Sequence, residues 1–271
     1  MNTAMNKGTL KTRTAHQFSK AVTSYTENAR VQHQAAEALF SLMGRDEVFG
    51  NVLVDLGSGP GLHSLSLQRY GAKLISIDLS EAMLRAQSAV QWRICADMDS
   101  LPLQSSSIDV VFSNFAMQWS QNIDFVLGEL YRVLRHNGVT YISIVLDGSL
   151  KEICETYSRS GMQSKVNSFP HFDVITRSIK RAGFNLMQGQ TKTFIDHFET
   201  PMAAFKSLKL IGANQSVNSC VAKADSAEAK VRELSGRAFL KSISTHYPKT
   251  GLACLLTYNV GLFCIKKDIK G

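Results

Sequence analysis

Long apolar runs are absent from this sequence of 271 residues. No stretch approaches the roughly 20 apolar residues that a membrane-spanning helix requires, so we expect no membrane partner. The first 20 residues are basic and rich in Ser and Thr, without the hydrophobic centre of a secretory signal. We therefore expect a cytoplasmic protein whose N-terminal tail leads into a helix.

Cysteine is scarce and scattered. The chain has five cysteines, an odd number, and no two of them have the C-x-x-C spacing of a metal or redox motif. This pattern argues against a disulfide framework and a zinc site, and it fits a reducing cytoplasm. We therefore expect no metal. The residues are Cys95, Cys154, Cys220, Cys254 and Cys264.

Proline is also rare, with five residues, whereas hydrophobic residues make up 44% of the chain. This composition predicts a folded protein, and the length allows one large domain or a domain with a subdomain. Acidic residues are outnumbered, and the net charge of +8 suggests an acidic partner. Because no basic run carries interleaved aromatic residues, we expect no nucleic-acid partner. An acidic protein or an anionic substrate fits the charge.

The most informative segment is Val-Leu-Val-Asp-Leu-Gly-Ser-Gly-Pro-Gly at residues 52–61. An apolar run that ends in alternating glycines predicts a buried strand, a tight loop and a following helix. Glycines allow backbone conformations that a Cβ forbids, and they let a ligand lie against the main chain. A dinucleotide-binding loop requires two residues between its second and third glycines, but Gly59 and Gly61 are separated by one. A nucleotide-type cofactor site, a dinucleotide site and a purely structural turn remain open at this point.

Strands and helices alternate after this loop. We predict strands at 52–56, 73–78, 91–96, 108–113 and 139–146, with helices at 61–70, 81–89 and 122–135. This alternation predicts a parallel sheet with right-handed crossovers, whose ligands bind at the carboxyl ends of the strands. Polar residues follow four of these strands, namely Asp55, Asp78, Asp97 and Asn114.

The flanking regions differ from this core. Residues 14–43 predict one helix, and the region after 148 predicts helices at 149–159 and 171–182 and a hairpin of strands at 184–195 and 253–265. Helices at 200–212 and 221–242 interrupt the hairpin. We therefore divide the chain into a helical cap at 1–45, a core at 46–198 and 251–271, and a helical lid at 199–250.

Several motifs resemble a known family. The segments at 55–61, 76–84 and 96–103 are similar to class I S-adenosylmethionine methyltransferases. More narrowly, the segments at 113–119 (Ser-Asn-Phe-Ala-Met-Gln-Trp), 129–134, 148–150, 207–213 and 256–258 resemble the malonyl-acyl-carrier-protein O-methyltransferases of biotin synthesis. The resemblance implies an α/β, Rossmann-like fold with a mostly parallel seven-stranded sheet and an antiparallel last strand.

The resemblance also implies a site for S-adenosylmethionine. Asp55 and the backbone of the glycine loop would face the methionyl end, Asp78 would accept hydrogen bonds from the ribose, and Asp97 would reach the adenine amino group. Leu79 and Met98 would flank the adenine, Asn114 would lie near the methionyl end, and Tyr25 would close over the cofactor. The expected cofactor residues are Asp55, Gly57, Ser58, Gly59, Gly61, Asp78, Leu79, Asp97, Met98 and Asn114.

The implied reaction is methylation of the free carboxylate of a malonyl thioester, carried by acyl carrier protein or coenzyme A. The ester would hide the charge, so that fatty-acid elongation enzymes accept the chain as a primer. Gln118 and Trp119 would offer neutral N–H donors to the carboxylate, and Lys206, Lys209, Arg177 and Arg181 would contact the carrier. A methyltransferase for another small acid or a quinone precursor, and a non-catalytic binding protein, are the alternatives.

Overall fold

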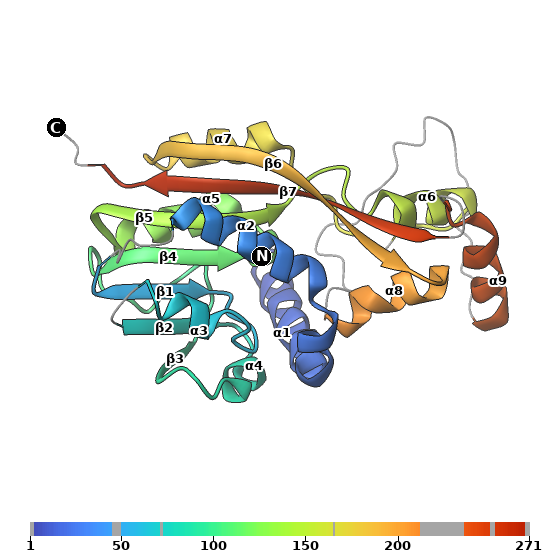
Figure 1. Cartoon of the computed structure of the whole chain (residues 1–271), viewed down its shortest axis with the longest axis horizontal. Helices are drawn as coiled ribbons and strands as arrows, with labels where there is room; N and C mark the ends of the chain where they lie inside the picture. Colours follow the sequence, from blue (N-terminus) through green and yellow to red (C-terminus); the bar gives the residue numbers. More distant parts are fainter. Residues whose placement is uncertain are drawn as a thin grey trace.

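The core is one seven-stranded sheet with the strand order β3-β2-β1-β4-β5-β7-β6 (Figure 1). A computed structural model describes residues 3–44, 50–70, 73–164, 166–211, 236–249 and 253–268. The first five strands are parallel, and β7 runs antiparallel between β5 and β6. The predicted fold class is therefore confirmed. The strands are β1 (Val52–Leu56), β2 (Lys73–Asp78), β3 (Trp92–Cys95), β4 (Ile108–Asn114), β5 (Leu134–Val145), β6 (Asn185–Phe198) and β7 (Cys254–Lys266).

Helices cover both faces of the sheet. One hydrophobic core joins the sheet to α2, α6 and α8, and a second core on the other face joins it to α5 and α7. The described helices are α1 (Thr3–Asn28), α2 (Arg30–Met43), α3 (Ser64–Leu67), α4 (Glu81–Ala86), α5 (Ile123–Val133), α6 (Lys151–Arg159), α7 (Phe172–Arg181), α8 (Pro201–Leu210), α9 (Gly236–His246) and the 3-10 helix η1 (Met117–Trp119). None of them is long and apolar enough to cross a membrane.

The N-terminal region forms two helices, and the first begins at Thr3, so the predictions of an N-terminal tail and of one helix over 14–43 are wrong. The break is at Ala29, which is fully buried and has a non-helical backbone (φ −86°, ψ 40°). At the end of α1, the Asn28 side-chain amide donates a hydrogen bond to the Ser24 carbonyl at 2.7 Å. Tertiary packing causes the break, because α1 packs against α4 and α8 whereas α2 packs against β5, β6 and β7.

Two helices of the predicted lid are described. Thr200 caps α8 by accepting a hydrogen bond from the Ala203 amide, and α8 ends close to the expected residue. The helix predicted at 221–242 falls largely outside the described residues, and α9 covers its last part. In Figure 1, α8 and α9 gather at one end of β6 and β7, whereas α7 lies toward the other end.

An aromatic cluster joins α2 to the glycine loop. Phe40 stacks on Phe112 and Tyr70, with ring centroids 5.2 and 5.9 Å apart. His63 follows the loop and lies edge-on to His33 at 5.0 Å. The Nε2 atom of His63 is buried without a hydrogen-bond partner among the described residues. Burial, with a smaller contribution from the charge of His33, lowers the pKa of His63 to about 4.

Acid should therefore destabilise the fold through His63. Between the ordinary pKa of 6.5 and about 4, the unfolded chain binds a proton here that the folded chain does not, so stability is full above pH 6.5 and falls as the pH drops toward 4. The whole difference corresponds to about 3 kcal/mol. His63→Phe should remove this acid sensitivity. Urea unfolding of both proteins between pH 7 and 4.5 tests this, and equal losses in the two proteins would contradict it.

Candidate functional site

The glycine loop follows β1 and has the backbone that its sequence predicts. Gly57, Gly59 and Gly61 have φ values of +73°, +54° and +79°, a region that residues with a Cβ rarely adopt. The amides of Gly57 and Ser58 donate to the Ile77 carbonyl at 2.8 and 3.1 Å. These bonds fix the loop against the end of the neighbouring strand β2.

Asp78 at the end of β2 organises the loop further. Its two carboxylate oxygens accept hydrogen bonds from the Gly59 amide at 2.8 Å and the Ser80 amide at 2.7 Å. Burial raises the pKa of Asp78, and these backbone bonds oppose the rise. Because each carboxylate oxygen has two lone pairs, both can still accept a hydrogen bond from a ligand hydroxyl.

Gln87 holds the loop from the other side and was not predicted. Its side-chain Nε2 donates to the Ser58 hydroxyl at 2.8 Å and to the Gly59 carbonyl at 2.6 Å. Gln87 lies just after α4, where its side chain is buried. No feature of the sequence distinguishes it from a glutamine on the protein surface, so only the fold could identify it.

A pocket, here called the glycine-loop pocket, opens beside this loop. Six of the ten predicted cofactor residues line it, namely Gly57, Gly59, Asp78, Leu79, Asp97 and Met98. Its empty space, with the open solvent at its mouth included, is about 750 Å³. The predicted residues Asp55, Ser58, Gly61 and Asn114 do not line it.

Asp55 lies behind the loop with only 4% of its surface exposed. Burial, followed by the charge of Asp78, raises the pKa of Asp55 to about 8. Burial, followed by the charges of Asp78 and Asp55, raises the pKa of the Tyr25 phenol. A buried pair of carboxyl groups is stabilised by a cation, so this end of the pocket favours a positively charged ligand group.

Asn114 makes hydrogen bonds within the protein to two neighbouring elements. Its side-chain amide donates to the Gln32 carbonyl of α2 at 3.0 Å, and its oxygen accepts from the Ser143 hydroxyl at 2.6 Å. Asn114 therefore joins α2, β4 and β5. Its predicted proximity to the cofactor remains a prediction.

Asp97 is paired with a residue that the sequence did not single out. Lys11 of α1 contacts the carboxylates of both Asp97 and Asp99, and Ser120 donates to Asp99 at 2.6 Å. Lys11 also lines the glycine-loop pocket. The N-terminal helix is thus attached to the edge of the pocket where the adenine was predicted.

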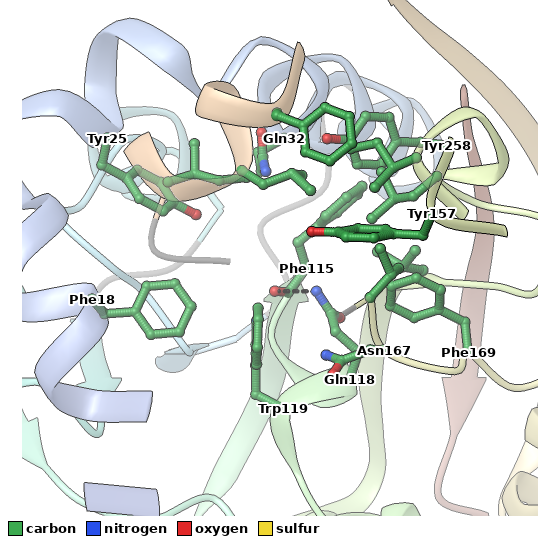
Figure 2. Close-up of a pocket in the computed structure, with 17 residues that line it drawn as sticks. Phe18, Tyr25, Gln32, Phe115, Gln118, Trp119, Tyr157, Asn167, Phe169 and Tyr258 are labelled. Carbon is green, nitrogen blue, oxygen red and sulfur yellow. Dashed lines mark hydrogen bonds between the residues drawn. The ribbon is translucent and has the colours of Figure 1, made fainter. Parts of the chain in front are cut away.

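A second pocket, here called the aromatic pocket, adjoins the first (Figure 2). Four residues line both pockets and form a shared wall: Phe18, Tyr25, Phe115 and Trp119. Phe18 meets Trp119 edge-on, with ring centroids 5.2 Å apart. The empty space of the aromatic pocket, with the open solvent at its mouth included, is about 890 Å³. Two ligands could therefore meet across this wall.

Gln118 and Trp119 both line the aromatic pocket, as their predicted role requires. The Gln118 side-chain Nε2 donates to the Phe115 carbonyl at 2.7 Å, which leaves one of its two hydrogens for a ligand. Its oxygen is buried without a partner among the described residues. Their contact with a substrate carboxylate remains a prediction.

The four predicted basic residues do not form one surface. Lys206 and Lys209 are exposed on α8, whose Phe205 and Leu208 line the aromatic pocket. Arg177 and Arg181 lie on α7, which packs on the opposite face of the sheet. Arg181 also pairs with Asp124 at 2.7 Å.

In the described part of the chain, no group of three or more His, Cys, Asp or Glu is placed to hold a metal ion. The donor set of the two pockets is instead suited to an organic cofactor, with carboxylates for hydroxyl and cationic groups and apolar side chains for a ring.

Known proteins are similar to this chain in sequence or in fold. A protein-family profile described as "Methyltransferase domain" matches residues 54–142. The malonyl-acyl-carrier-protein O-methyltransferase of Salmonella typhimurium is 30% identical over 255 residues, which cover 93% of this chain and 95% of that protein. The biotin biosynthesis bifunctional protein of Saccharophagus degradans is 30% identical over 273 residues, which cover 95% of this chain and 47% of that protein. Among solved structures, the YcgJ protein of Bacillus subtilis aligns with a TM-score of 0.56 at 15% identity, covering 88% of this chain and 99% of that one.

Proposed function

The chain belongs to the malonyl-acyl-carrier-protein O-methyltransferases, and from this premise we propose that it methylates the free carboxylate of a malonyl thioester on acyl carrier protein. The observation that carries the proposal is the wall shared by the two pockets, where a methyl donor in one pocket meets an acceptor in the other. The methyl ester would serve as an uncharged primer for chain elongation toward biotin.

The glycine-loop pocket fits S-adenosylmethionine, which supplies an electrophilic methyl group on a sulfonium when bound. Asp78 would accept the ribose hydroxyls, and the buried carboxyl of Asp55 would be stabilised in its ionised form by the positive methionyl end. Leu79 and Met98 would flank the adenine. Tyr25 closes the pocket on the side of the acceptor.

The reaction needs no general base, because a malonyl carboxylate is already ionised at neutral pH. A carboxylate oxygen would form a bond to the methyl carbon as the bond from that carbon to sulfur breaks, and the electron pair would stay on sulfur. The products are a methyl ester and S-adenosylhomocysteine. The protein contributes positioning and a dry pocket, in which opposite charges neutralise each other without reorganising water.

The surface of α8 is the proposed docking site for the acidic carrier. Phe205 and Leu208 face the pocket, whereas Lys206 and Lys209 are exposed on the outside of the same helix. A carrier bound there would present its thioester arm beside the aromatic pocket. Arg177 and Arg181, on the other face of the sheet, are not part of this surface.

Reversing the charge of α8 should weaken use of the carrier-bound substrate. We expect the double variant Lys206→Glu with Lys209→Glu to raise the KM for malonyl-acyl carrier protein about tenfold, because two attractive contacts become repulsive. The KM for malonyl-coenzyme A should change less. Lys180→Glu on α7 is the control and should change neither value. Equal effects of the double variant on both substrates would remove α8 from the docking surface.

The function itself is tested by transfer of labelled methyl from S-adenosylmethionine to purified malonyl-acyl carrier protein. Acetyl-acyl carrier protein and free malonate are assayed alongside. Label on the malonyl carrier alone is the expected result. Label on free malonate would favour a small-acid methyltransferase, and cofactor binding without transfer to any acceptor would overturn the proposed substrate.

A further inference from the structure

The aromatic pocket has no formal charge in its lining. Among the described residues that line it there is no Lys, Arg, Asp or Glu. A carboxylate that enters such a pocket loses its hydration, and its burial is unfavourable unless hydrogen-bond donors replace the water. The proposed substrate therefore needs neutral donors in this lining.

Several polar residues in the lining are already engaged, wholly or in part. One N–H of the Gln118 amide donates to the Phe115 carbonyl and leaves the other for a ligand, and Asn167 has a partner within the protein. The Tyr25 phenol lies toward the carboxylates of Asp78 and Asp55, on the side of the cofactor. These groups are less available to a second ligand than a donor with no partner.

Two further phenols line the pocket, and their surroundings differ. Burial raises the pKa of Tyr258, and so do the nearby carboxylates of Asp196 and Glu152, whose charge opposes the approach of another anion. Burial, followed by the Cys154 sulfur, also raises the pKa of Tyr157, but no carboxylate contributes there. The Tyr157 hydroxyl has no hydrogen-bond partner among the described residues. Of the two, Tyr157 is the better donor to an anion.

Tyr157 is also well placed and held in position. Figure 2 shows its hydroxyl pointing into the hollow, toward Phe115 of the shared wall and toward Gln118. Its ring packs edge-on against Phe205 of α8, with centroids 5.6 Å apart. The helix that carries it is fixed to β7, because the buried Glu152 carboxylate accepts hydrogen bonds from the amide and hydroxyl of Thr257.

We propose that Tyr157 positions the substrate by donating its phenolic O–H to the malonyl carboxylate oxygen that does not attack the methyl group. This inference rests on the proposed function and assigns a specificity residue to it. A neutral donor suits the reaction, because the carboxylate loses its charge in the transition state and a Lys or Arg would stabilise the charged ground state more strongly. The phenol orients the nucleophile and still allows it to react.

The test is Tyr157→Phe, which removes only the hydroxyl. The dissociation constants of malonyl- and acetyl-acyl carrier protein are measured with the S-adenosylhomocysteine complex, together with KM and kcat for the malonyl form. We expect the preference for malonyl over acetyl to fall about tenfold, and kcat/KM to fall by at least as much. Affinity for S-adenosylmethionine should stay unchanged.

Tyr247→Phe is the matched control. Its hydroxyl donates to the Leu255 carbonyl at 2.6 Å and Tyr247 does not line the pocket, so this variant should lower the melting temperature without changing the preference. An equal loss of affinity for both thioesters in Tyr157→Phe, or no loss, would overturn the proposal for Tyr157. The proposed function would still stand in that case, provided that the wild type methylates malonyl-acyl carrier protein. If the wild type fails to methylate malonyl-acyl carrier protein, the proposed function fails, and this inference fails with it.

Discussion

Replacing Asp78 with Ala is expected to weaken the binding of S-adenosylmethionine about 100-fold. The carboxylate would lose two charge-assisted hydrogen bonds to the ribose, each of which contributes about 1.5 kcal/mol. It would also release the Gly59 and Ser80 amides, which Asp78 holds at 2.8 and 2.7 Å. The glycine loop would therefore lose its preorganised shape together with the ligand contacts.

Calorimetric titration of the purified protein with S-adenosylmethionine measures this effect. Asp78→Asn is an informative companion, because an amide nitrogen cannot accept the hydrogen bond that one of the two backbone amides donates. It should therefore bind almost as weakly as the Ala variant. Asp97→Ala is the control at the adenine end and should cost tenfold or less. Unchanged affinity in Asp78→Ala would remove this residue from the ribose site.

Sequence patterns correctly predicted the strand bounds and the helix cap that depend on neighbouring residues in the chain. The bounds of β1 and β2 agree with the predicted strands, because an apolar run that ends in an acid or a glycine specifies both its burial and its end. Ser80 caps α4 as expected, since its side chain accepts from the Met83 amide. These features depend on residues close together in the chain.

The missed features depend on contacts between distant segments. Lys11 reaches Asp97 across 86 positions of sequence, and the Asn114 amide meets α2 across 82 positions. The break at Ala29 follows from two different packing surfaces and not from a glycine or proline. Hydrophobic periodicity contains no information about such pairings, so the residues that join α1 and α2 to the site could be found only in the folded chain.

The same limit explains why the sequence could not show which basic residues lie near the aromatic pocket. Sequence composition predicted a positive surface for an acidic partner, but it could not separate the exposed residues of α8 from those of α7. The fold separates them, because α8 lines the aromatic pocket and α7 packs with α5 on the opposite face of the sheet. The position of a charge relative to the pocket, more than its presence, decides whether it can guide a substrate.

Gly57 and Gly59 should respond very differently to the same substitution. A Cβ at Gly57 would lie 2.2 Å from the Cβ of Ala116, a distance that no packed pair of carbons adopts, and the residue has a φ of +73°. We expect Gly57→Ala to lower the free energy of unfolding by about 4 kcal/mol or more, since the backbone at the end of β1 must move. At Gly59 nothing lies within 4 Å of an added Cβ, and the backbone conformation alone costs about 1 kcal/mol.

Gly59 nevertheless lines the glycine-loop pocket, so its added methyl group would occupy space that the cofactor needs. Gly59→Ala should therefore remain folded in urea titrations and lose most of its affinity for S-adenosylmethionine. For Gly57→Ala, the double variant with Ala116→Gly isolates the cause. If the clash dominates, the second change restores all of the lost stability except the cost of the positive φ. If stability does not recover, the backbone conformation and not the contact with Ala116 is what requires glycine at this position.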